Sequence, residues 1–353
     1  MKEKSMKKLL ILVFLFFNST YGIRITESPI FSIELPLSTT SNIRPEFNLS
    51  IKEDKKRYST CTSASWYGND ILMVSNLFDR SIYVYKINQN DAEIIQIIDN
   101  LNGNPELDDV SKDKKYYAVS LYDHIPKKES IAKINLYSIL ENGRLSLIKT
   151  IPGVNGEYNT HGVRFSPDVN LLAFTTINRP GYINIYKKID NIDDFEPCFS
   201  LENALYPLKP KGIDFSPDSQ FLAAVYSLRA STITDNKIAG IAIYKLNSKN
   251  GSIDPNPVYI SKDLDLCVPE NVVFYPNGLY LFISNQGNDA IVVYKFNPQT
   301  GQILNQEFKL SNPKAQLSFP HGFSISPNGK YLSVCNYGTN KVNIYEISDM
   351  SNI

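Results

Sequence analysis

One phrase recurs along this chain of 353 residues. It consists of an apolar strand, a tight turn such as Ser-Pro-Asp, a second apolar strand, and a third strand that ends in an aromatic residue. Self-similarity at a fixed period constrains the architecture more than any local pattern, because one such unit cannot bury its own faces. The clearest copies begin HGVRFSPD at His161, KGIDFSPD at Lys211, ENVVFYPN at Glu270 and HGFSISPN at His321.

The last aromatic residue of the third strand marks the period. Successive markers are separated by 52, 49, 58, 50 and 51 residues. Two weaker copies, which begin at Cys61 and Glu106, precede the four clear ones. The six markers are Tyr85, Tyr137, Tyr186, Tyr244, Tyr294 and Tyr345.

Each unit has the composition of antiparallel β-structure. Its segments are short and rich in Ile, Val, Tyr and Phe, and Pro, Gly, Asn and Asp bound them. A weaker fourth segment, such as EFKLS at 307–311, follows each of the first five markers. Four strands in a unit of about fifty residues indicate an all-β fold, a single β-propeller of four-stranded blades. We expect six blades, with seven as the alternative; a β-sandwich is the competing all-β fold.

The last unit lacks its outer strand, because the chain ends soon after KVNIYEI. Residues 46–53, EFNLSIKE, resemble the outer strand at 307–311. We therefore predict that an N-terminal strand closes the ring and removes an exposed edge. Residues 30–35, IFSIEL, resemble another third strand, which is either an extra strand or the remnant of a seventh blade.

The first 22 residues have the pattern of a secretory signal peptide. A basic start with four lysines precedes the apolar run at 9–17, and small residues precede the expected cleavage after Gly22. The run is short for a membrane span, although an uncleaved anchor is the alternative. We expect an exported chain, in the periplasm, at the cell surface or secreted, with one propeller domain over 23–353 and no stable membrane insertion.

The charge of this domain is nearly balanced. Removal of four Lys and one Glu with residues 1–22 leaves 32 basic and 35 acidic residues, a net charge of −3. A near-neutral chain gives no electrostatic reason to expect nucleic acid as a partner. We expect a monomer.

The phrases FSPDSQFLAAVY, YPNGLYLFISNQGNDAIVVYKFNPQTGQI and SPNGKYLSVCNYGTNKVNIYEI resemble the lactonase-type, YVTN-like β-propeller superfamily. The resemblance is clear over 161–345 and faint before. It implies the propeller fold, and it implies an activity less strongly, because these are scaffold motifs of turns and packing residues. Members of that superfamily include a lactone hydrolase acting on a sugar phosphate. Its hydrolases have seven blades as a rule, so six units weaken the transfer of activity.

Aligned units place one residue each at the start of the inner strand, where a propeller has the mouth of its central channel. Two imidazoles and two carboxylates there have the chemistry of a divalent-cation site or of a general acid and base. Capping of the channel without chemistry is the alternative. The residues at this register are Cys61, Glu106, His161, Lys211, Glu270 and His321. Of these, His161, His321, Glu106 and Glu270 are the catalytic or metal candidates, and Cys61 and Lys211 are ligand-binding candidates.

Two loops between second and third strands, at 122–133 and 227–240, are longer than the rest. Loops on a rigid scaffold commonly carry recognition. We expect His124, Arg179 and Arg229 to frame a ligand pocket on the same face.

These patterns predict an exported propeller that binds a small molecule or a protein partner at the channel mouth without catalysis. The alternative is a lactonase-type hydrolase that acts on a sugar lactone at the same place. The only cofactor that the candidates suggest is a divalent cation.

Overall fold

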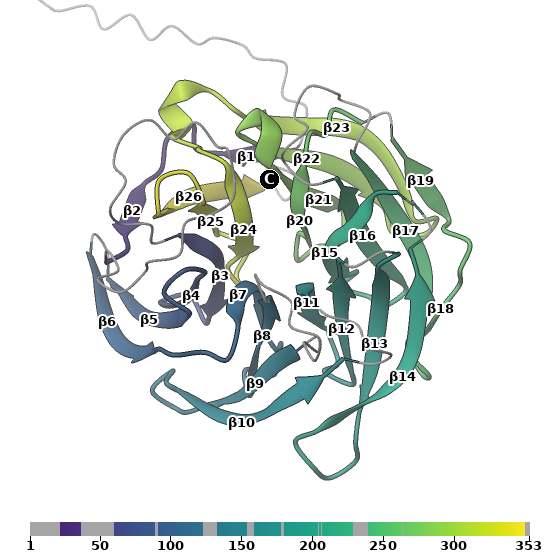
Figure 1. The fold of residues 1–353 in the computed structure, drawn as a ribbon. Helices are drawn as coiled ribbons and strands as arrows, with labels where there is room; N and C mark the ends of the chain where they lie inside the picture. The colour runs from purple at the N-terminus through teal and green to yellow at the C-terminus, as the bar shows by residue number, and fades with distance from the viewer. Residues whose placement is uncertain are drawn as a thin grey trace, which may run out of the picture.

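The computed structural model describes residues 22–36, 60–88, 91–122, 133–153, 159–177, 180–203, 205, 207–228, 239–262 and 264–349. These residues form six antiparallel sheets arranged around a central axis (Figure 1). The predicted all-β propeller is therefore confirmed, with six blades in the described part of the chain.

Within each blade the strands follow one another from the axis outward (Figure 1). The first three blades are β3 (Cys61–Tyr67), β4 (Ile71–Asn76), β5 (Ser81–Asn88) and β6 (Asp91–Ile98); β7 (Asn104–Val110), β8 (Tyr116–Tyr122), β9 (Lys133–Ile139) and β10 (Leu145–Pro152); and β11 (Thr160–Phe165), β12 (Leu171–Thr176), β13 (Tyr182–Lys188) and β14 (Phe195–Glu202).

The outer edge varies in the other three blades, since two short strands share it in the fourth and in the sixth. The fourth blade is β15 (Lys209–Phe215), β16 (Phe221–Ser227) and β17 (Ala239–Asn247) with β18 (Ser252–Ile253) and β19 (Tyr259–Ser261); the fifth is β20 (Pro269–Phe274), β21 (Tyr280–Asn285), β22 (Ala290–Asn297) and β23 (Gln302–Leu310); the sixth is β24 (Pro320–Ile325), β25 (Tyr331–Asn336) and β26 (Lys341–Asp349) with β1 (Ile23–Ile25) and β2 (Phe31–Glu34).

The six marker tyrosines hold one structural position. Each lies in the third strand, is buried, and pairs with an apolar or aromatic residue of the second strand, as Tyr186 pairs with Leu172. The Ser-Pro-Asp turn before the second strand is held by its own side chains. Ser166 Oγ donates to Asp168 and accepts from the backbone N–H of Leu171. Local turn chemistry and alternating apolar residues thus set the register of each unit.

An N-terminal strand closes the ring, as predicted, but residues 23–34 supply it. β1 pairs with β26 at 347–349, and β2 pairs with it at 341–344. The segment that resembles a third strand is therefore the outer edge of the sixth blade and not the remnant of a seventh. Residues 46–53, which we expected at that edge, lie outside the described residues, and the edge itself is already occupied.

Neighbouring blades share their cores. Tyr116 and Leu136 of the second blade, for example, pack in one cluster with Phe165 and Phe174 of the third. Each sheet therefore buries both faces, and only the outer strands meet solvent. These carry single exposed apolar residues such as Ile97.

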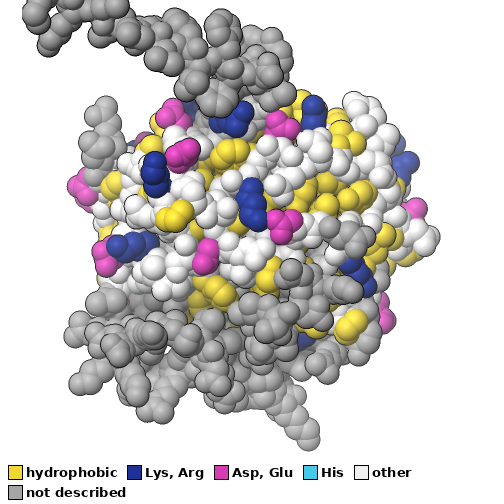
Figure 2. All heavy atoms as spheres, turned by 90° about the horizontal axis from the view of Figure 1, so that it is seen from above, with side chains coloured by type: hydrophobic (Ala, Val, Ile, Leu, Met, Phe, Trp, Pro, Cys, Tyr) yellow, Lys and Arg dark blue, Asp and Glu magenta, His cyan; other side chains and the backbone are white. Residues whose placement is uncertain are grey.

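Figure 2 shows acidic and basic side chains interspersed on one side of the propeller, with apolar atoms between them. No large area of that face carries charges of one sign only. Among the described residues, no helix has the length and apolarity needed to cross a membrane.

Candidate active site

Each inner strand carries a β-bulge close to its first residue, where its pairing with the second strand shifts register. A bulge adds one residue and re-aims its side chain. In five of the six described blades the bulge contains the residue that starts the repeated phrase, and in the first blade it contains the residue that follows it. We call these six residues the axial ring: Thr62, Glu106, His161, Lys211, Glu270 and His321.

The first blade departs from the prediction by one residue. Cys61 pairs with Asn76, and its thiol lies 3.4 Å from the carbonyl oxygen of Lys341. Thr62 falls inside the bulge instead, and its hydroxyl donates to the carbonyl of Pro105 over 3.0 Å. Cys61 therefore lies outside the axial ring, contrary to the sequence prediction.

The other five predicted ring residues come together around the axis. His161 Nε2 and Lys211 Nζ each lie 3.0 Å from the same oxygen of Glu270. Glu106 Oε2 lies 3.5 Å from His321 Nε2 and 3.9 Å from His161 Nε2. The rings of the two histidines, from opposite blades, are 5.4 Å apart. Both histidines and both glutamates are buried.

Glu270 is ionised although it is buried. Burial by itself would raise the pKa of its carboxyl group, but the Lys211 ammonium and the hydrogen bond from His161 outweigh burial and hold the pKa well below its usual range. Because a carboxylate only accepts, His161 Nε2 carries the proton in this contact. Burial, and next to it the charge of Lys211, lowers the pKa of His161 to about 3, so its ring is neutral.

His321 is held in the other tautomer. Its Nδ1 lies 3.0 Å from the carbonyl oxygen of Thr62, which can only accept a hydrogen bond. The proton therefore sits on Nδ1, and Nε2 presents a lone pair toward Glu106. Burial is the largest of the influences that lower the pKa of His321 below its usual value of 6.5. A neutral imidazole oriented by a backbone carbonyl is a suitable general base.

Glu106 differs from Glu270 in protonation. Burial raises the pKa of Glu106 to about 8, and the charge of Lys211 offsets this only in part. Lys211 forms its 3.0 Å ion pair with Glu270, not with Glu106. The pKa values of the two carboxyl groups are thus shifted in opposite directions. Paired carboxyl groups with separated pKa values are typical of acid–base catalysis.

The donor set also resembles a metal site. Glu106, His161 and His321 each offer one ligand atom, and these atoms lie within 4.8 Å of one another. The Lys211 ammonium opposes a cation there, because its Nζ is 3.5 Å from His161 Nε2. The donors fit a divalent ion in number and kind, while the fixed charge beside them disfavours one.

The loop candidates His124, Arg179 and Arg229 lie outside the described residues. Tyr337 was not predicted from the sequence; its ring stacks on His321 with centroids 5.8 Å apart. Tyr337 lies in the short turn between β25 and β26. Its place between a second and a third strand was the feature of the sequence that could have identified it. Thr62, the partner of His321, was not predicted either.

Glycine follows the ring residue in three blades because the inner strands approach closely at the axis. A Cβ atom on Gly322 would lie 2.4 Å from the carbonyl oxygen of Thr62, and one on Gly212 would lie 2.5 Å from Cα of Asn271. The first of these contacts involves the same oxygen that orients His321. Glycine here allows the packing on which the ring geometry depends.

We expect Gly322→Ala to disturb both stability and the site. The added methyl group must push Thr62 away, which should lower the free energy of unfolding by about 1–3 kcal/mol. Urea unfolding measures this change, and the pKa of His321 from NMR titration reports the lost orientation. Gly240→Ala is the matched control, because its Cβ would remain 3.1 Å from the nearest atom. Equal stability of the two variants would contradict the close packing.

The C-terminal part of the propeller matches a known protein family. Residues 269–352 match the family described as lactonase, 7-bladed beta-propeller. A 6-phosphogluconolactonase of Formosa agariphila is 22% identical over 270 residues, which cover 75% of this chain and 73% of that protein. The chain is a β-propeller that is similar to lactonase-type propellers. The family description names seven blades, whereas the described part of this propeller forms six.

Solved structures share the fold of this propeller. A putative 6-phosphogluconolactonase from Bacteroides uniformis superposes with a TM-score of 0.55 at 14% identity, over 78% of this chain and 77% of that one. The periplasmic gluconolactonase of Pseudomonas aeruginosa superposes with a TM-score of 0.50 at 13% identity, over 71% and 85%. At such identities the likeness concerns the fold alone. The matched 269–352 region contains two axial-ring residues, Glu270 and His321.

Proposed function

We propose that this propeller hydrolyses a sugar lactone at the axial ring. The observation that carries the proposal is the pair of buried glutamates that face the same two imidazoles, while only one of the glutamates also pairs with Lys211. Lactone hydrolysis requires a base for the attacking water and an acid for the leaving oxygen. The names of the relatives, a 6-phosphogluconolactonase and a gluconolactonase, give the substrate class.

In this mechanism His321 Nε2 takes a proton from water, and the resulting hydroxide attacks the lactone carbonyl carbon. The Lys211 ammonium and the Glu106 carboxyl proton stabilise the oxyanion that forms. Glu106 then gives its proton to the ring oxygen as the carbon–oxygen bond breaks. His321 returns the water-derived proton to Glu106 across the 3.5 Å that separates them, which restores the starting state. Glu270 holds Lys211 and His161 in place.

Proton release, measured by pH-stat, tests the proposal on a panel that includes gluconolactones and 6-phosphogluconolactone. Turnover of at least one member well above the uncatalysed rate is expected. The function predicted first from the sequence was binding without catalysis. It would be favoured if a lactone shifts the melting temperature but no member of the panel is cleaved.

The pH profile follows from the two protonation states. Glu106 must be protonated, so kcat/KM should fall as the pH rises through about 8. His321 must be neutral, so kcat/KM should also fall on the acidic side, below 6.5. After subtraction of hydroxide-driven hydrolysis, the profile should be bell-shaped. Glu106→Gln should remove the alkaline limb and lower the maximum; a limb unchanged in this variant would assign it to another group.

We also propose that the chain is exported and processed after Gly22. The pattern of residues 1–22 supports this, and β1 begins at Ile23, so cleavage there leaves the closing strand intact. N-terminal sequencing of protein from the native host should read Ile23 first. A protein that retains Met1 in the membrane fraction would contradict export as a processed chain.

A further inference from the structure

A cavity lies at the other end of the axis from the axial ring, and we call it the second cavity to keep it apart from the proposed catalytic site. It has a volume of 350 Å³. Its walls come from the ends of the inner strands and from the turns that follow them, three or more residues beyond the axial ring. Arg164 and Phe165, for instance, line the cavity, whereas His161 at the start of the same strand belongs to the ring. The cavity is therefore separate from the proposed catalytic site.

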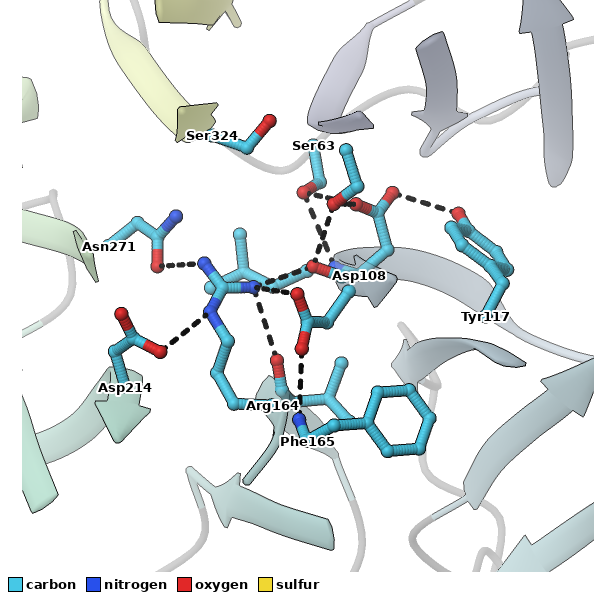
Figure 3. Close-up of polar contacts among 12 residues, drawn as sticks. Ser63, Asp108, Tyr117, Arg164, Phe165, Asp214, Asn271 and Ser324 are labelled. Carbon is cyan, nitrogen blue, oxygen red and sulfur yellow. Dashed lines mark hydrogen bonds and ion pairs between the residues drawn. The ribbon is translucent and has the colours of Figure 1, made fainter. Parts of the chain in front are cut away.

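A buried guanidinium group forms its floor. Arg164 is 5% exposed and reaches across the axis, where Nη1 donates to the carbonyl oxygen of Asp108 over 2.7 Å. Nη2 lies 3.3 Å from Asn271 Oδ1. Figure 3 shows the side chain extended between Asp214 on one side and Asp108 on the other. Arg164 thus connects the inner strands of four blades and is fixed in position.

Two carboxylates flank this guanidinium without closing hydrogen bonds to it. Asp109 Oδ1 lies 3.8 Å from Nη1 of Arg164, and Asp214 Oδ1 lies 3.6 Å from Nε (Figure 3). Both gaps exceed a hydrogen bond. Backbone contacts hold both carboxylates. Asp109 Oδ2 accepts from Phe165 N–H, and both oxygens of Asp214 are engaged, since Oδ2 accepts from Phe274 N–H and Oδ1 accepts from Phe215 N–H. Nη1 of Arg164 also donates to the carbonyl oxygen of Val163 over 3.3 Å. Asp109 Oδ1 therefore faces the guanidinium without bonding to it, and backbone contacts fix the positions of both groups.

The charges of the cavity nearly cancel. Burial raises the pKa of Asp214 to about 6, and it raises that of Asp109 as well, while Arg164 and the more distant Lys112 offset this in part. Two carboxylates thus face three cations, because Lys114 lines the cavity together with Lys112 and Arg164. A strongly charged ligand would upset this balance and lose its own hydration. A hydroxyl group, by contrast, both donates and accepts, and it fits between Asp109 and Arg164.

The remaining walls are mostly apolar, although Ser65, Ser111 and Ser324 also line them. The cavity is lined by the prolines of the turns and by aromatic and aliphatic residues, among them Trp66, Pro167 and Phe215. A few converging polar groups in a mostly apolar cavity of this volume are typical of a small-molecule site. A ligand with several hydroxyl groups on a carbon skeleton can contact both the polar groups and the apolar walls.

We propose that the second cavity binds a neutral polyhydroxylated ligand of monosaccharide size. One hydroxyl donates to Asp109 and accepts from Arg164, a second contacts Asp214, and the carbon skeleton lies against the apolar wall. This site does not depend on lactone hydrolysis at the axial ring.

The chain contains its own reporter for this cavity. Trp66 is the single tryptophan of the sequence and lines the cavity. Titration with glucose, galactose, xylose or inositol should change Trp66 emission in a saturable way, with a dissociation constant of about 1 mM for the best ligand. Gluconate and glucosamine, which add a negative or a positive charge, should bind at least about tenfold more weakly.

Asp109→Asn is the decisive variant. An asparagine oxygen can still accept from Phe165 N–H, so the fold is retained, but the carboxylate that faces Arg164 is lost. Affinity should fall about tenfold or more. His321→Ala, at the other end of the axis, should leave the titration unchanged. Isothermal calorimetry on wild type, Asp109→Asn and His321→Ala should give a stoichiometry of one ligand per chain wherever binding is measurable.

Three outcomes would overturn the proposal. One is the absence of any emission change or heat with the neutral panel up to about 100 mM. Another is equal binding by Asp109→Asn and wild type. The last is binding that His321→Ala abolishes, which would assign the ligand to the axial ring. If only glucosamine binds, the cavity recognises an amine and the neutral-ligand proposal fails.

Discussion

Replacing His321 with alanine should lower kcat/KM for lactone hydrolysis about 10²–10⁴-fold, the usual contribution of a general base. The ring of His321 is oriented by Thr62 and directs its free nitrogen at Glu106, so no neighbouring group replaces it. His161→Ala should have a smaller effect, because His161 supports Glu270 and takes no proton in the mechanism. The rates are measured by pH-stat on variants with matched melting temperatures.

The double variant separates the roles of the two histidines. If both act on one step, their effects should not add, because loss of the base leaves little for the second residue to support. Lys295→Ala, on the exposed face of β22, is the surface control and should keep full activity. A His321→Ala protein that folds normally and keeps more than a third of the wild-type rate would exclude the proposed base.

Much of the fold could be predicted from the sequence because the repeat carries its own register. The Ser-Pro-Asp turns, as at Ser166, set where each second strand begins, and the marker tyrosines fill equivalent buried positions. The choice of closing strand could not be predicted. Residues 30–35 and 46–53 have similar β-patterns, and only the pairing with β26 shows which segment takes the edge.

The axial ring could be predicted to the same extent as the fold, and its prediction was wrong at one position for a similar reason. Glu106, His161, Lys211 and His321 share one distance, five residues, to the serine of their turn. The first unit has Trp-Tyr-Gly in place of that turn, so nothing in the sequence fixed its register. The prediction of Cys61 is therefore wrong by one position, and Thr62 occupies the ring.

The difference in pKa between the two glutamates depends on contacts between blades, which an alignment of the repeat units does not show. Glu106 and Glu270 are equivalent in the repeat, yet the ion pair with Lys211 ionises only one of them. The second cavity could not be predicted for the same reason, because Arg164 has no counterpart in the other units and contacts residues of three other blades.

Deletion of residues 22–35 should prevent accumulation of soluble protein. The deletion strips β1 and β2 from β26 and leaves its backbone edge unpaired, which is a template for aggregation. It also removes four buried side chains, Ile23, Ile25, Ile33 and Leu35. At about 1.5–3 kcal/mol each, their burial contributes about 6–12 kcal/mol, which is comparable with the whole stability of a typical domain.

A shorter deletion distinguishes loss of the strands from loss of the N-terminus in general. A protein that lacks only residues 1–21 retains β1 and β2 and should be soluble, with the melting temperature of the processed chain. A synthetic peptide of residues 22–36, added during refolding of the longer deletion, should restore part of the soluble yield by pairing with β26. If the longer deletion is soluble and melts normally without the peptide, the closing strand is dispensable. The shared cores of adjacent blades would then be sufficient to hold the ring together.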